Sequence, residues 1–172
     1  FTDSARLFAH VMLLERARRN KEDRTRLGER RGEATRSRPS GPLIWVHGAS
    51  VGESLSLLPV IEALASQNYS VIVTSGTVTS AQVLARRLPE GSTHQYMPLD
   101  FPTYVFRFLD HWQPDLAIFA ESEIWPNILS QAHRRSIPLV LVNARMSERS
   151  FRRWTRLRSL AHYLFTRFDL CL

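Results

Sequence analysis

The sequence has little cysteine and no long apolar run. Its 172 residues include one cysteine, Cys171, which excludes a disulfide framework, a Cys-rich zinc site and a redox pair. A reducing compartment is the expectation that follows. The longest apolar run near the start, residues 7–14, is about half of the ~18 residues that a membrane-spanning helix needs. Lysine is also scarce, since Lys21 stands alone among many arginines.

The formal net charge is +7, and most of it lies in the first 40 residues. That segment carries a net charge of +5, and the rest of the chain carries +2. A positive field favours anionic partners, such as phospholipid head groups, phosphorylated substrates or nucleic acid, without choosing among them. The overall composition, 44% hydrophobic, 10% aromatic and 23% charged, is typical of a globular domain and excludes a disordered, collagen-like or coiled-coil chain.

The beginning of the chain predicts a separate segment. Residues 4–31 have a helical pattern of apolar side chains, but the stretch from Arg16 to Arg31 is so strongly charged that we expect it to lie outside the core. Residues 32–42 have the glycine, serine and proline content of a linker. We therefore expect a basic amphipathic, membrane-proximal segment over residues 1–40 and a globular lobe over residues 41–172.

The two ends predict a processed or excised fragment. The first residue is Phe1 rather than methionine, and the apolar run at residues 168–172 is typical of a strand with no turn after it. A function that needs further residues would then be absent from this chain.

Beyond residue 42, apolar runs alternate with helical patterns. The runs LIWV and LVLV are apolar at consecutive positions, as in strands that are covered on both faces. Runs are separated by about 25 residues, which matches right-handed βαβ crossovers. The predicted fold class is therefore α/β, an open parallel Rossmann-like sheet with helices on both faces. Strands are expected at residues 43–47, 70–74, 94–97, 116–120, 139–142 and 168–172, and helices near residues 53–66, 79–88, 102–111, 124–135 and 152–166.

Ligands bind such a sheet at the carboxyl ends of its strands, so the loops that follow the strands hold the candidate site. The first loop, HGASVGE at residues 47–53, lacks the dinucleotide glycine fingerprint and the lysine of a P-loop. Ser50 and Glu53 have the spacing of a capping box, in which the glutamate satisfies a backbone donor. The alternative is that Glu53 is a general base that removes a proton from an acceptor hydroxyl. The spacing alone favours the capping box.

The loop after the fourth strand brings two carboxylates together. Glu123 suits the first turn of a helix, where the helix dipole favours a negative charge, and Trp125 is expected in the core. Glu121 lies closest to the strand end and, facing Glu53, would hold substrate hydroxyls or share a proton. A structural and a functional role for Glu121 stay open.

Other strand ends carry polar groups. Arg145 suits a phosphate or a carboxylate, although a salt bridge to one of the glutamates is slightly favoured. Ser75 and Thr77 lie in a hydroxyl-rich turn suited to anions or sugars, and also to helix capping. His47 ends the first strand, where it either lines the site or supports it. The six histidines have no metal-binding spacing.

Five blocks, spread in order over residues 43 to about 160, resemble the N-terminal half of the bacterial 3-deoxy-D-manno-octulosonic acid (Kdo) transferases of lipopolysaccharide synthesis. They are LIWVHGASVGE from residue 43, TSGT from residue 74, MPLD from residue 97, ESEIWPN from residue 121 and VNARMSERS from residue 142. Five blocks in one order are far more specific than any single motif. The basic stretch before the linker also resembles the juxtamembrane segment of the family.

The resemblance implies the N-terminal, acceptor-binding lobe of a GT-B glycosyltransferase, with the donor-binding C-terminal lobe outside this chain. The family transfers Kdo from CMP-Kdo to a lipid A precursor (lipid IVA), with inversion, without a metal ion and without a cofactor. Glu53 falls on the position of the general base, and Glu121 on a position that organises the transition state. The substrate-binding residues expected at the strand ends are Ser50, Gly52, Ser75, Thr77, Glu123 and Arg145.

The implied partners are the lipid A precursor, CMP-Kdo through the absent lobe, and the anionic surface of the inner membrane, with no nucleic acid. The implied location is the cytoplasmic face of the bacterial inner membrane, peripheral or with a single N-terminal anchor. The hydrophobic anchor usual in the family is largely missing from this sequence. The fragment alone is expected to be inactive.

Two other functions stay open. One is a non-catalytic, basic Rossmann-like module that binds anionic lipid or nucleic acid. Arg152, Arg153 and Trp154 have the composition of a nucleic-acid patch, but without a recognised motif a solvated helix face is the better interpretation. The other is a GT-B glycosyltransferase that uses a different nucleotide-sugar donor.

Overall fold

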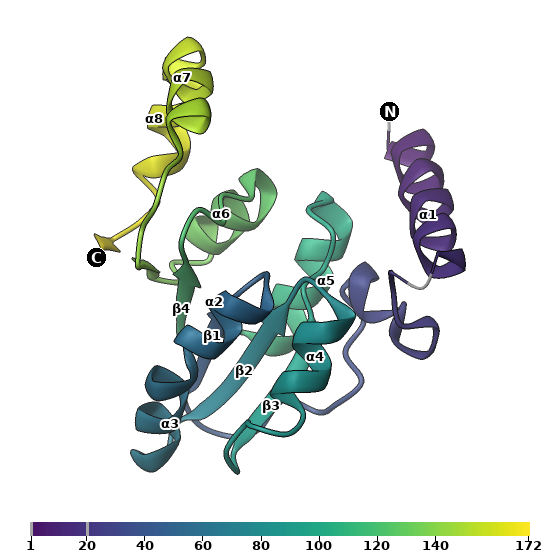
Figure 1. Cartoon of the computed structure of the whole chain (residues 1–172), viewed down its shortest axis with the longest axis vertical. Helices are drawn as coiled ribbons and strands as arrows, with labels where there is room; N and C mark the ends of the chain where they lie inside the picture. The colour runs from purple at the N-terminus through teal and green to yellow at the C-terminus, as the bar shows by residue number, and fades with distance from the viewer. Residues whose placement is uncertain (1, 20) are drawn as a thin grey trace.

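The apolar runs pair into one parallel sheet, as Figure 1 shows. The structure is a computed structural model that describes residues 2–19 and 21–172, without the side chains of residues 2–8 and 10. Within this part of the chain the sheet has six strands in the order β3-β2-β1-β4-β5-β6. The strands are β1 (Leu43–His47), β2 (Ser70–Ser75), β3 (Ser92–Tyr96), β4 (Leu116–Ala120), β5 (Leu139–Val142) and β6 (Leu170–Cys171).

The helices that follow the strands cover both faces of the sheet. In Figure 1, α2, α3 and α4 lie on the viewer's side of the strands and α5 lies behind them. The α-helices are α1 (Thr2–Arg18), α2 (Val51–Ser56), α3 (Leu58–Ser66), α4 (Val78–Leu84), α5 (Pro102–Trp112), α6 (Pro126–Arg134), α7 (Glu148–Arg156) and α8 (Arg158–Phe165); two 3₁₀ turns, η1 (Arg24–Arg26) and η2 (Glu29–Arg31), follow α1. The predicted α/β class is confirmed.

Alternate strand residues enter two hydrophobic layers. On one face, the ring of Trp45 lies 4.8 Å from that of Phe108 and 4.9 Å from that of Phe119. On the other face, Val46 and Ile61 are fully buried in a second cluster. Burying one such side chain contributes roughly 1.5–3 kcal/mol, so both layers are needed to hold the sheet. The consecutive apolar positions of the sequence are the result of this two-sided burial.

Two predicted helices are in fact broken. The helix expected at residues 53–66 divides into α2 and α3 at Leu57, just before Pro59. Proline has no N–H to continue the ladder and its ring crowds the preceding turn, which accounts for the break. The helix expected at residues 152–166 divides into α7 and α8 at Leu157, whose backbone angles, φ −115° and ψ 47°, are not helical.

The expectation that the stretch from Arg16 to Arg31 lies outside the core is wrong. Glu22, Glu29 and Arg30 have exposed fractions of 5%, 0% and 5%. They are buried because their charges are paired: Glu22 binds Arg30 (2.8 Å), and Glu29 binds Arg26 (2.8 Å). Glu29 also accepts the amide hydrogen of Tyr96 in β3 (2.7 Å). The Glu29 carboxylate thereby accepts an amide hydrogen at the outer edge of β3, where the sheet has no further strand to supply the acceptor.

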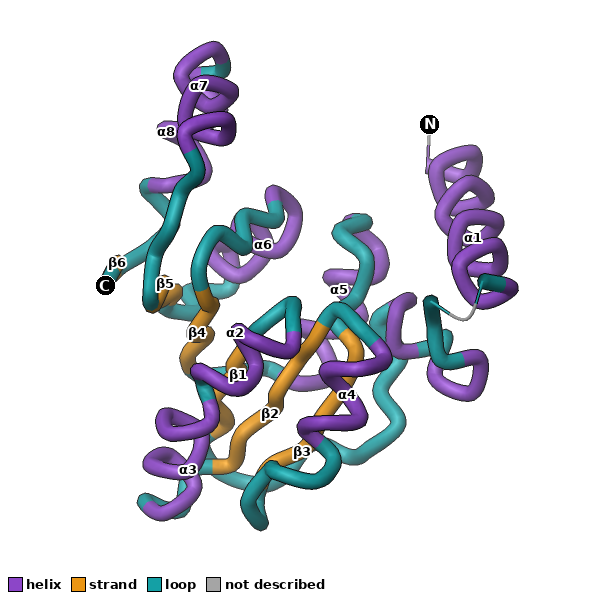
Figure 2. The backbone as a smooth tube through the Cα atoms, viewed as in Figure 1, coloured by secondary structure: helices purple, strands orange, loops and turns teal. Residues whose placement is uncertain are grey.

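The loops that follow β1, β2 and β4 leave the sheet at the same end, which Figure 2 traces. α1 and the α7–α8 hairpin stand on either side of this end. None of the described helices combines the length and the apolar character needed to cross a membrane. The strand order reverses between β1 and β4, so the crevice between their carboxyl ends is where an open α/β sheet binds its ligand.

Candidate functional site

The loop between β1 and α2 lies against the end of β2. The Gly48 amide donates to the carbonyl of Thr74 (3.1 Å), and the Gly76 amide donates to the carbonyl of Ala49 (3.0 Å). A Cβ at Gly76 would lie 2.9 Å from the Ala49 carbonyl oxygen, which is closer than real Cβ contacts come. Glycine is therefore required for this approach, and the two loops are held together as one unit.

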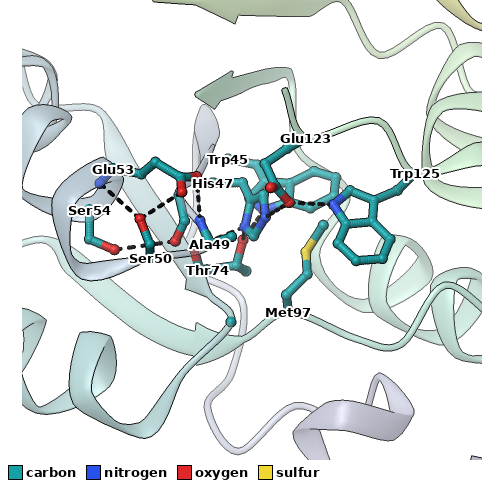
Figure 3. Close-up of polar contacts among 12 residues, drawn as sticks. Trp45, His47, Ala49, Ser50, Glu53, Ser54, Thr74, Met97, Glu123 and Trp125 are labelled. Carbon is teal, nitrogen blue, oxygen red and sulfur yellow. Dashed lines mark hydrogen bonds and ion pairs between the residues drawn. The ribbon is translucent and has the colours of Figure 1, made fainter. Parts of the chain in front are cut away.

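The Glu53 carboxylate turns back toward the start of its own helix (Figure 3). Its Oε2 accepts the amide hydrogen of Ala49 (2.9 Å), and its Oε1 accepts the hydroxyl hydrogen of Ser50 (2.6 Å). The Ser50 Oγ in turn accepts the amide hydrogen of Glu53 (3.3 Å). The capping interpretation of this pair is confirmed, with the difference that the glutamate binds the amide of Ala49 rather than that of Ser50.

The Glu53 carboxylate can accept more hydrogen bonds than the two that cap the helix. Each oxygen accepts one hydrogen bond from the described residues, whereas a carboxylate offers about four acceptor positions. The Glu53 side chain is half-buried rather than enclosed. The general-base role of Glu53 stays a prediction. The geometry leaves the carboxylate free to accept a further hydrogen bond, but it does not test proton transfer. Gly52 is exposed in the first turn of α2 beside it.

A second polar network joins β1 to the loop after β4 (Figure 3). His47, with an exposed fraction of 1%, places Nδ1 2.9 Å from Thr74 Oγ1 and Nε2 3.3 Å from Glu123 Oε2. The Trp45 indole N–H donates to the same threonine hydroxyl (2.8 Å). The Trp125 indole N–H donates to Glu123 Oε2 (2.7 Å). His47 thus holds Thr74 and Glu123 in place and also lines the cavity beside them, so both roles left open for it are found.

Both ring nitrogens of His47 have polar partners in this network. Nδ1 of His47 lies within hydrogen-bond reach of both the hydroxyl (2.9 Å) and the carbonyl (3.1 Å) of Thr74, and Nε2 faces the Glu123 carboxylate. Burial favours the protonated carboxyl of Glu123, but the hydrogen bond and charge of His47 and the hydrogen bond of Trp125 outweigh it and hold the pKa of Glu123 below its usual 4.5. Glu123 is therefore a carboxylate at neutral pH.

Two sequence-based expectations for this loop are wrong. Glu123 does not lie in the first turn of a helix, because α6 begins at Pro126, where the fixed backbone of proline suits a helix start. Trp125 is not in the core, since 36% of it is exposed. It lies outside because its indole N–H needs the Glu123 carboxylate at the crevice as a partner.

Asp100 fixes where α6 starts. Its carboxylate accepts the amide hydrogens of Asn127 (3.1 Å) and Ile128 (2.9 Å). Burial raises the pKa of Asp100, although the amide hydrogen bonds of Asn127 and Ile128 oppose that shift. The contact anchors the helix that carries the Trp125 loop to the chain after β3.

Glu121 follows β4 directly and has a left-handed backbone, φ 58°. Its amide donates to the carbonyl of Val142 (2.9 Å), which continues the pairing of β4 with β5. Its half-buried side chain makes neither a hydrogen bond nor an ion pair with another residue in the described part of the chain. Its expected position facing Glu53, and its role at the transition state, stay predictions.

Arg145 does not form the salt bridge that was slightly favoured. In the described structure it is exposed, and its Nε donates to the side-chain oxygen of Asn143 (3.3 Å). Asn143 adopts a left-handed backbone, φ 51°, directly after β5, and its side chain is the hydrogen-bond partner of Arg145 in place of a carboxylate. The guanidinium is left open to solvent, and a role in anion binding stays a prediction.

The two hydroxyl residues after β2 differ sharply. Thr77 is exposed and caps α4, its Oγ1 accepting the amide hydrogen of Ser80 (3.0 Å). Ser75 is fully buried, and its hydroxyl lies 2.9 Å from His94 Nε2. Arg26 can only donate, so its contact with His94 Nδ1 leaves the hydrogen on Nε2, which donates to Ser75. Ser75 thus holds β2 to β3, and its hydroxyl is not available to a substrate in this arrangement.

A cavity of about 310 Å³ opens between α1 and the carboxyl ends of β1, β2 and β3. Its walls come from five parts of the chain and are mostly apolar. The lining residues are Met12, Arg16, Glu22, Arg30, His47, Ala49, Gly76, Thr77, Met97, Pro98, Leu99 and Trp125. Thr77 is the predicted site residue that reaches this cavity; Glu53 is connected to its wall through the Ala49 amide.

The rule that ligands bind at strand ends reaches Pro98 and Leu99, which line the cavity, but sequence reasoning gave these residues no role and did not include Met97. The signal was their place directly after β3. It missed Arg30 because a charged run is usually solvated, and only three-dimensional packing reveals that this arginine is buried.

The described residues offer no evident metal centre: within residues 2–19 and 21–172, histidine, cysteine, aspartate and glutamate do not gather in groups of three or more. The polar groups at the crevice are two carboxylates, an imidazole and backbone amides. They are suited to hydrogen bonding and proton transfer with a hydroxyl-bearing ligand.

Fold and site together define a Rossmann-like α/β lobe with its polar groups at the switch between β1 and β4. Residues 25–172 match the sequence model of the family described as 3-deoxy-D-manno-octulosonic-acid transferase (kdotransferase). The chain belongs to this family, so the resemblance stated from the sequence is confirmed. It is 39% identical over 165 residues to the probable 3-deoxy-D-manno-octulosonic acid transferase, mitochondrial, of Arabidopsis thaliana.

Bacterial relatives give the same result. The chain is 40% identical over 148 residues to the 3-deoxy-D-manno-octulosonic acid transferase of Rickettsia bellii, and 35% identical over 153 residues to that of Haemophilus influenzae. These matches cover 85% and 86% of the chain, and 94% for the plant relative. The chain spans only about a third of these relatives, 37% of the plant protein and 35% of each bacterial one.

Proposed function

We propose that this chain supplies the acceptor-binding lobe of a glycosyltransferase that moves Kdo from CMP-Kdo to a lipid A precursor, lipid IVA, in lipopolysaccharide synthesis. Membership of the Kdo transferase family supports the class of reaction. The observation that carries the proposal for these residues is the Glu53 carboxylate, held by two donors at the carboxyl end of β1 with acceptor positions to spare.

In the proposed reaction, Glu53 is the general base. The acceptor hydroxyl gives its proton to the carboxylate while its oxygen bonds to the anomeric carbon of Kdo. The bond from that carbon to the phosphate oxygen breaks, and CMP leaves with the electron pair. Attack opposite the leaving group inverts the anomeric centre. Because CMP is a good leaving group, the step is proposed to need neither a metal ion nor another cofactor.

The other residues of the crevice are assigned to binding and to the transition state. Glu121 is proposed to stabilise the transition state, and Glu123 to bind substrate hydroxyls with the carboxylate oxygen that His47 and Trp125 leave unused. Arg145, exposed and uncommitted to an acid, is proposed to bind a phosphate or carboxylate of the substrates. Ser50, Gly52 and Thr77 are assigned to the acceptor-binding surface.

The proposed partners are the lipid A precursor, CMP-Kdo held by residues outside this chain, and the anionic surface of the inner membrane, where the enzyme would act on the cytoplasmic face. Nucleic acid is not a proposed partner. Binding of the chain to vesicles that contain phosphorylated lipid A precursor, compared with binding to oligonucleotides at the same salt concentration, separates this function from that of a basic binding module. Preference for the oligonucleotide would contradict the proposal.

The decisive experiment is a chimera in which residues 1–172 replace the matched region of the Rickettsia bellii relative. We expect the chimera to transfer Kdo, and the Glu53→Gln variant to lose about 10²–10⁴-fold in kcat while it still binds CMP-Kdo, because only the proton acceptor is removed. Glu62→Gln, an exposed glutamate on α3, is the matched control and is expected to leave kcat unchanged.

Two results would overturn the proposal. A chimera that folds and binds CMP-Kdo but never transfers Kdo would refute the assigned reaction. A Glu53→Gln variant that keeps the kcat of the parent would refute the general base while leaving the reaction class intact.

A further inference from the structure

Arg30 is a buried arginine with three hydrogen-bond partners. Its Nε donates to Glu22 Oε2 (2.8 Å), and its two terminal nitrogens donate to the carbonyls of Met97 (3.0 Å) and Gly76 (2.5 Å). The side chains of Arg30 and Glu22 are 6% and 2% exposed. One planar guanidinium thereby joins the 3₁₀ turn η2 to the carboxyl ends of β3 and β2, where the candidate site lies.

The Gly76 contact leads onward to Glu53. The carbonyl of Gly76 is bound by Arg30, and the amide of Gly76 donates to the carbonyl of Ala49 (3.0 Å). The amide of Ala49 donates to Glu53 Oε2 (2.9 Å). Each step is a hydrogen bond, and the steric fit of Gly76 against Ala49 leaves the two loops little freedom to move independently.

The same network reaches back to α1. Arg16, in the last turns of that helix, donates to Glu22 Oε1 (2.7 Å), so Glu22 is bound by two arginines. The ring of Tyr96 lies beneath Arg30, with the guanidinium carbon 5.0 Å from its centroid. Arg16, Glu22 and Arg30 form one wall of the cavity that opens beside His47.

We propose that Arg30 is a positioning residue for the proposed reaction: by clamping the Gly76 and Met97 carbonyls, it sets the loop whose Ala49 amide orients the Glu53 carboxylate. Glu22 orients and neutralises the buried guanidinium, and Arg16 connects this clamp to α1. The catalytic part of this inference rests on the proposed function, whereas the mechanical part does not.

The arrangement is specific to arginine. Lysine would keep a positive charge opposite Glu22, but its single ammonium group cannot hold one carboxylate and two carbonyls along the directions of a planar fork. Stability alone does not require the pair, because a buried ion pair replaced by apolar residues of similar volume is often neutral or stabilising. This difference separates positioning from a merely structural role.

The first experiment measures amide hydrogen exchange in the 172-residue chain carrying Glu22→Met and Arg30→Met together. We expect an unchanged or higher midpoint of urea unfolding, but exchange about tenfold faster at the amides of Ala49 and Gly76, the factor that the loss of one ordinary hydrogen bond gives. Amides of β5 are expected to exchange as in the parent, since they lie outside the clamp. Arg30→Lys alone is expected to accelerate the same two amides.

Arg38→Met is the matched control. Arg38 also comes from the N-terminal part of the chain and also binds carbonyls, those of Trp112 (2.8 Å) and Gln113 (3.3 Å), but at the amino end of the sheet. Its loss is expected to leave exchange at Ala49 and Gly76 unchanged.

The second experiment measures transfer kinetics in the chimera described above. The double variant is expected to lower kcat at least about tenfold with little change in KM, since a displaced base slows the chemical step without removing binding contacts. Unchanged exchange at Ala49 and Gly76 in a folded double variant would overturn the clamp. Faster exchange with an unchanged kcat would overturn its catalytic consequence, and an inactive parent chimera would refute the proposed function while the exchange result stands.

Discussion

His47 and Glu123 meet across the switch in strand order, with Nε2 of the imidazole 3.3 Å from Oε2 of the carboxylate. The two residues are 76 positions apart, one at the end of β1 and one in the loop after β4. Because Trp125 binds the same oxygen, the pair also sets an indole against the cavity. The contact therefore ties the packing of two neighbouring strands to the shape of the candidate site.

Glu123→Gln is expected to destabilise the chain by about 1–2 kcal/mol at pH 7, because charge-assisted bonds to His47 and Trp125 are lost. The folded-state pKa of Glu123 is below its usual 4.5, so its stabilisation is complete above that pH and is lost as pH falls through the folded value. Urea unfolding at pH 7 and pH 3 checks this: the difference between parent and variant shrinks at the lower pH. A difference that grows on acidification would contradict the assignment.

His94 is expected to make the fold sensitive to acid. Burial first, and then the charges of Arg26 and Arg30, lower the pKa of His94 from 6.5 to about 3. The unfolded chain therefore binds a proton between these values that the folded chain excludes, and acidification from pH 7 to pH 5 costs about 2 kcal/mol through this group.

Replacing His94 with glutamine removes that titration. We expect the stability of His94→Gln, measured by urea unfolding, to fall less steeply between pH 7 and pH 5 than that of the parent. His133→Gln, on the last turn of α6, is a control because that side chain is exposed. If the stability of the parent and of His94→Gln fell equally between pH 7 and pH 5, His94 would take up a proton as readily in the folded chain as in the unfolded chain, and the prediction would be wrong.

The sheet was predictable from sequence because parallel strands covered on both faces leave unbroken apolar runs; β1, β4 and β5 have the predicted limits. Local rules also predicted the Ser50–Glu53 cap, since it depends on residues three apart. The His47–Glu123 contact was out of reach, because no local pattern records which distant loop supplies the partner of a strand-end histidine. The burial of Arg30 was missed for the same reason. Two of its partners are backbone carbonyls that follow distant strands, and every residue has a carbonyl, so the sequence does not mark these two as partners.

Ser50→Ala is expected to affect both stability and transfer. The loss of the cap costs about 1 kcal/mol. It also removes the donor to Glu53 Oε1, so the base is held by the Ala49 amide alone. Ser147→Ala is the matched control, since Ser147 caps α7 in the same way without contacting a carboxylate.

Thermal unfolding of the chain and kcat of the chimera separate the two effects. Both alanine variants are expected to lower the midpoint of unfolding by similar amounts, and only Ser50→Ala is expected to lower kcat. Equal kcat values for the two variants would indicate that the hydroxyl of Ser50 serves the helix and not the base.

Gly32→Ala is expected to be among the most destabilising single substitutions in the chain. Gly32 has φ +76°, and a Cβ there would collide with the backbone carbonyl oxygen of Tyr104 in α5, where neither partner can move aside. Gly41 provides a matched control with φ +80° and no atom within 4 Å of the added Cβ. The left-handed backbone alone costs about 1–2 kcal/mol in each variant, so any further loss at Gly32 measures the clash. Urea unfolding of both variants is expected to separate them by at least about 1 kcal/mol. Equal stabilities would mean that the segment after η2 does not pack on α5 as closely as the structure has it, and with it the docking of Arg30 against the sheet would be in question.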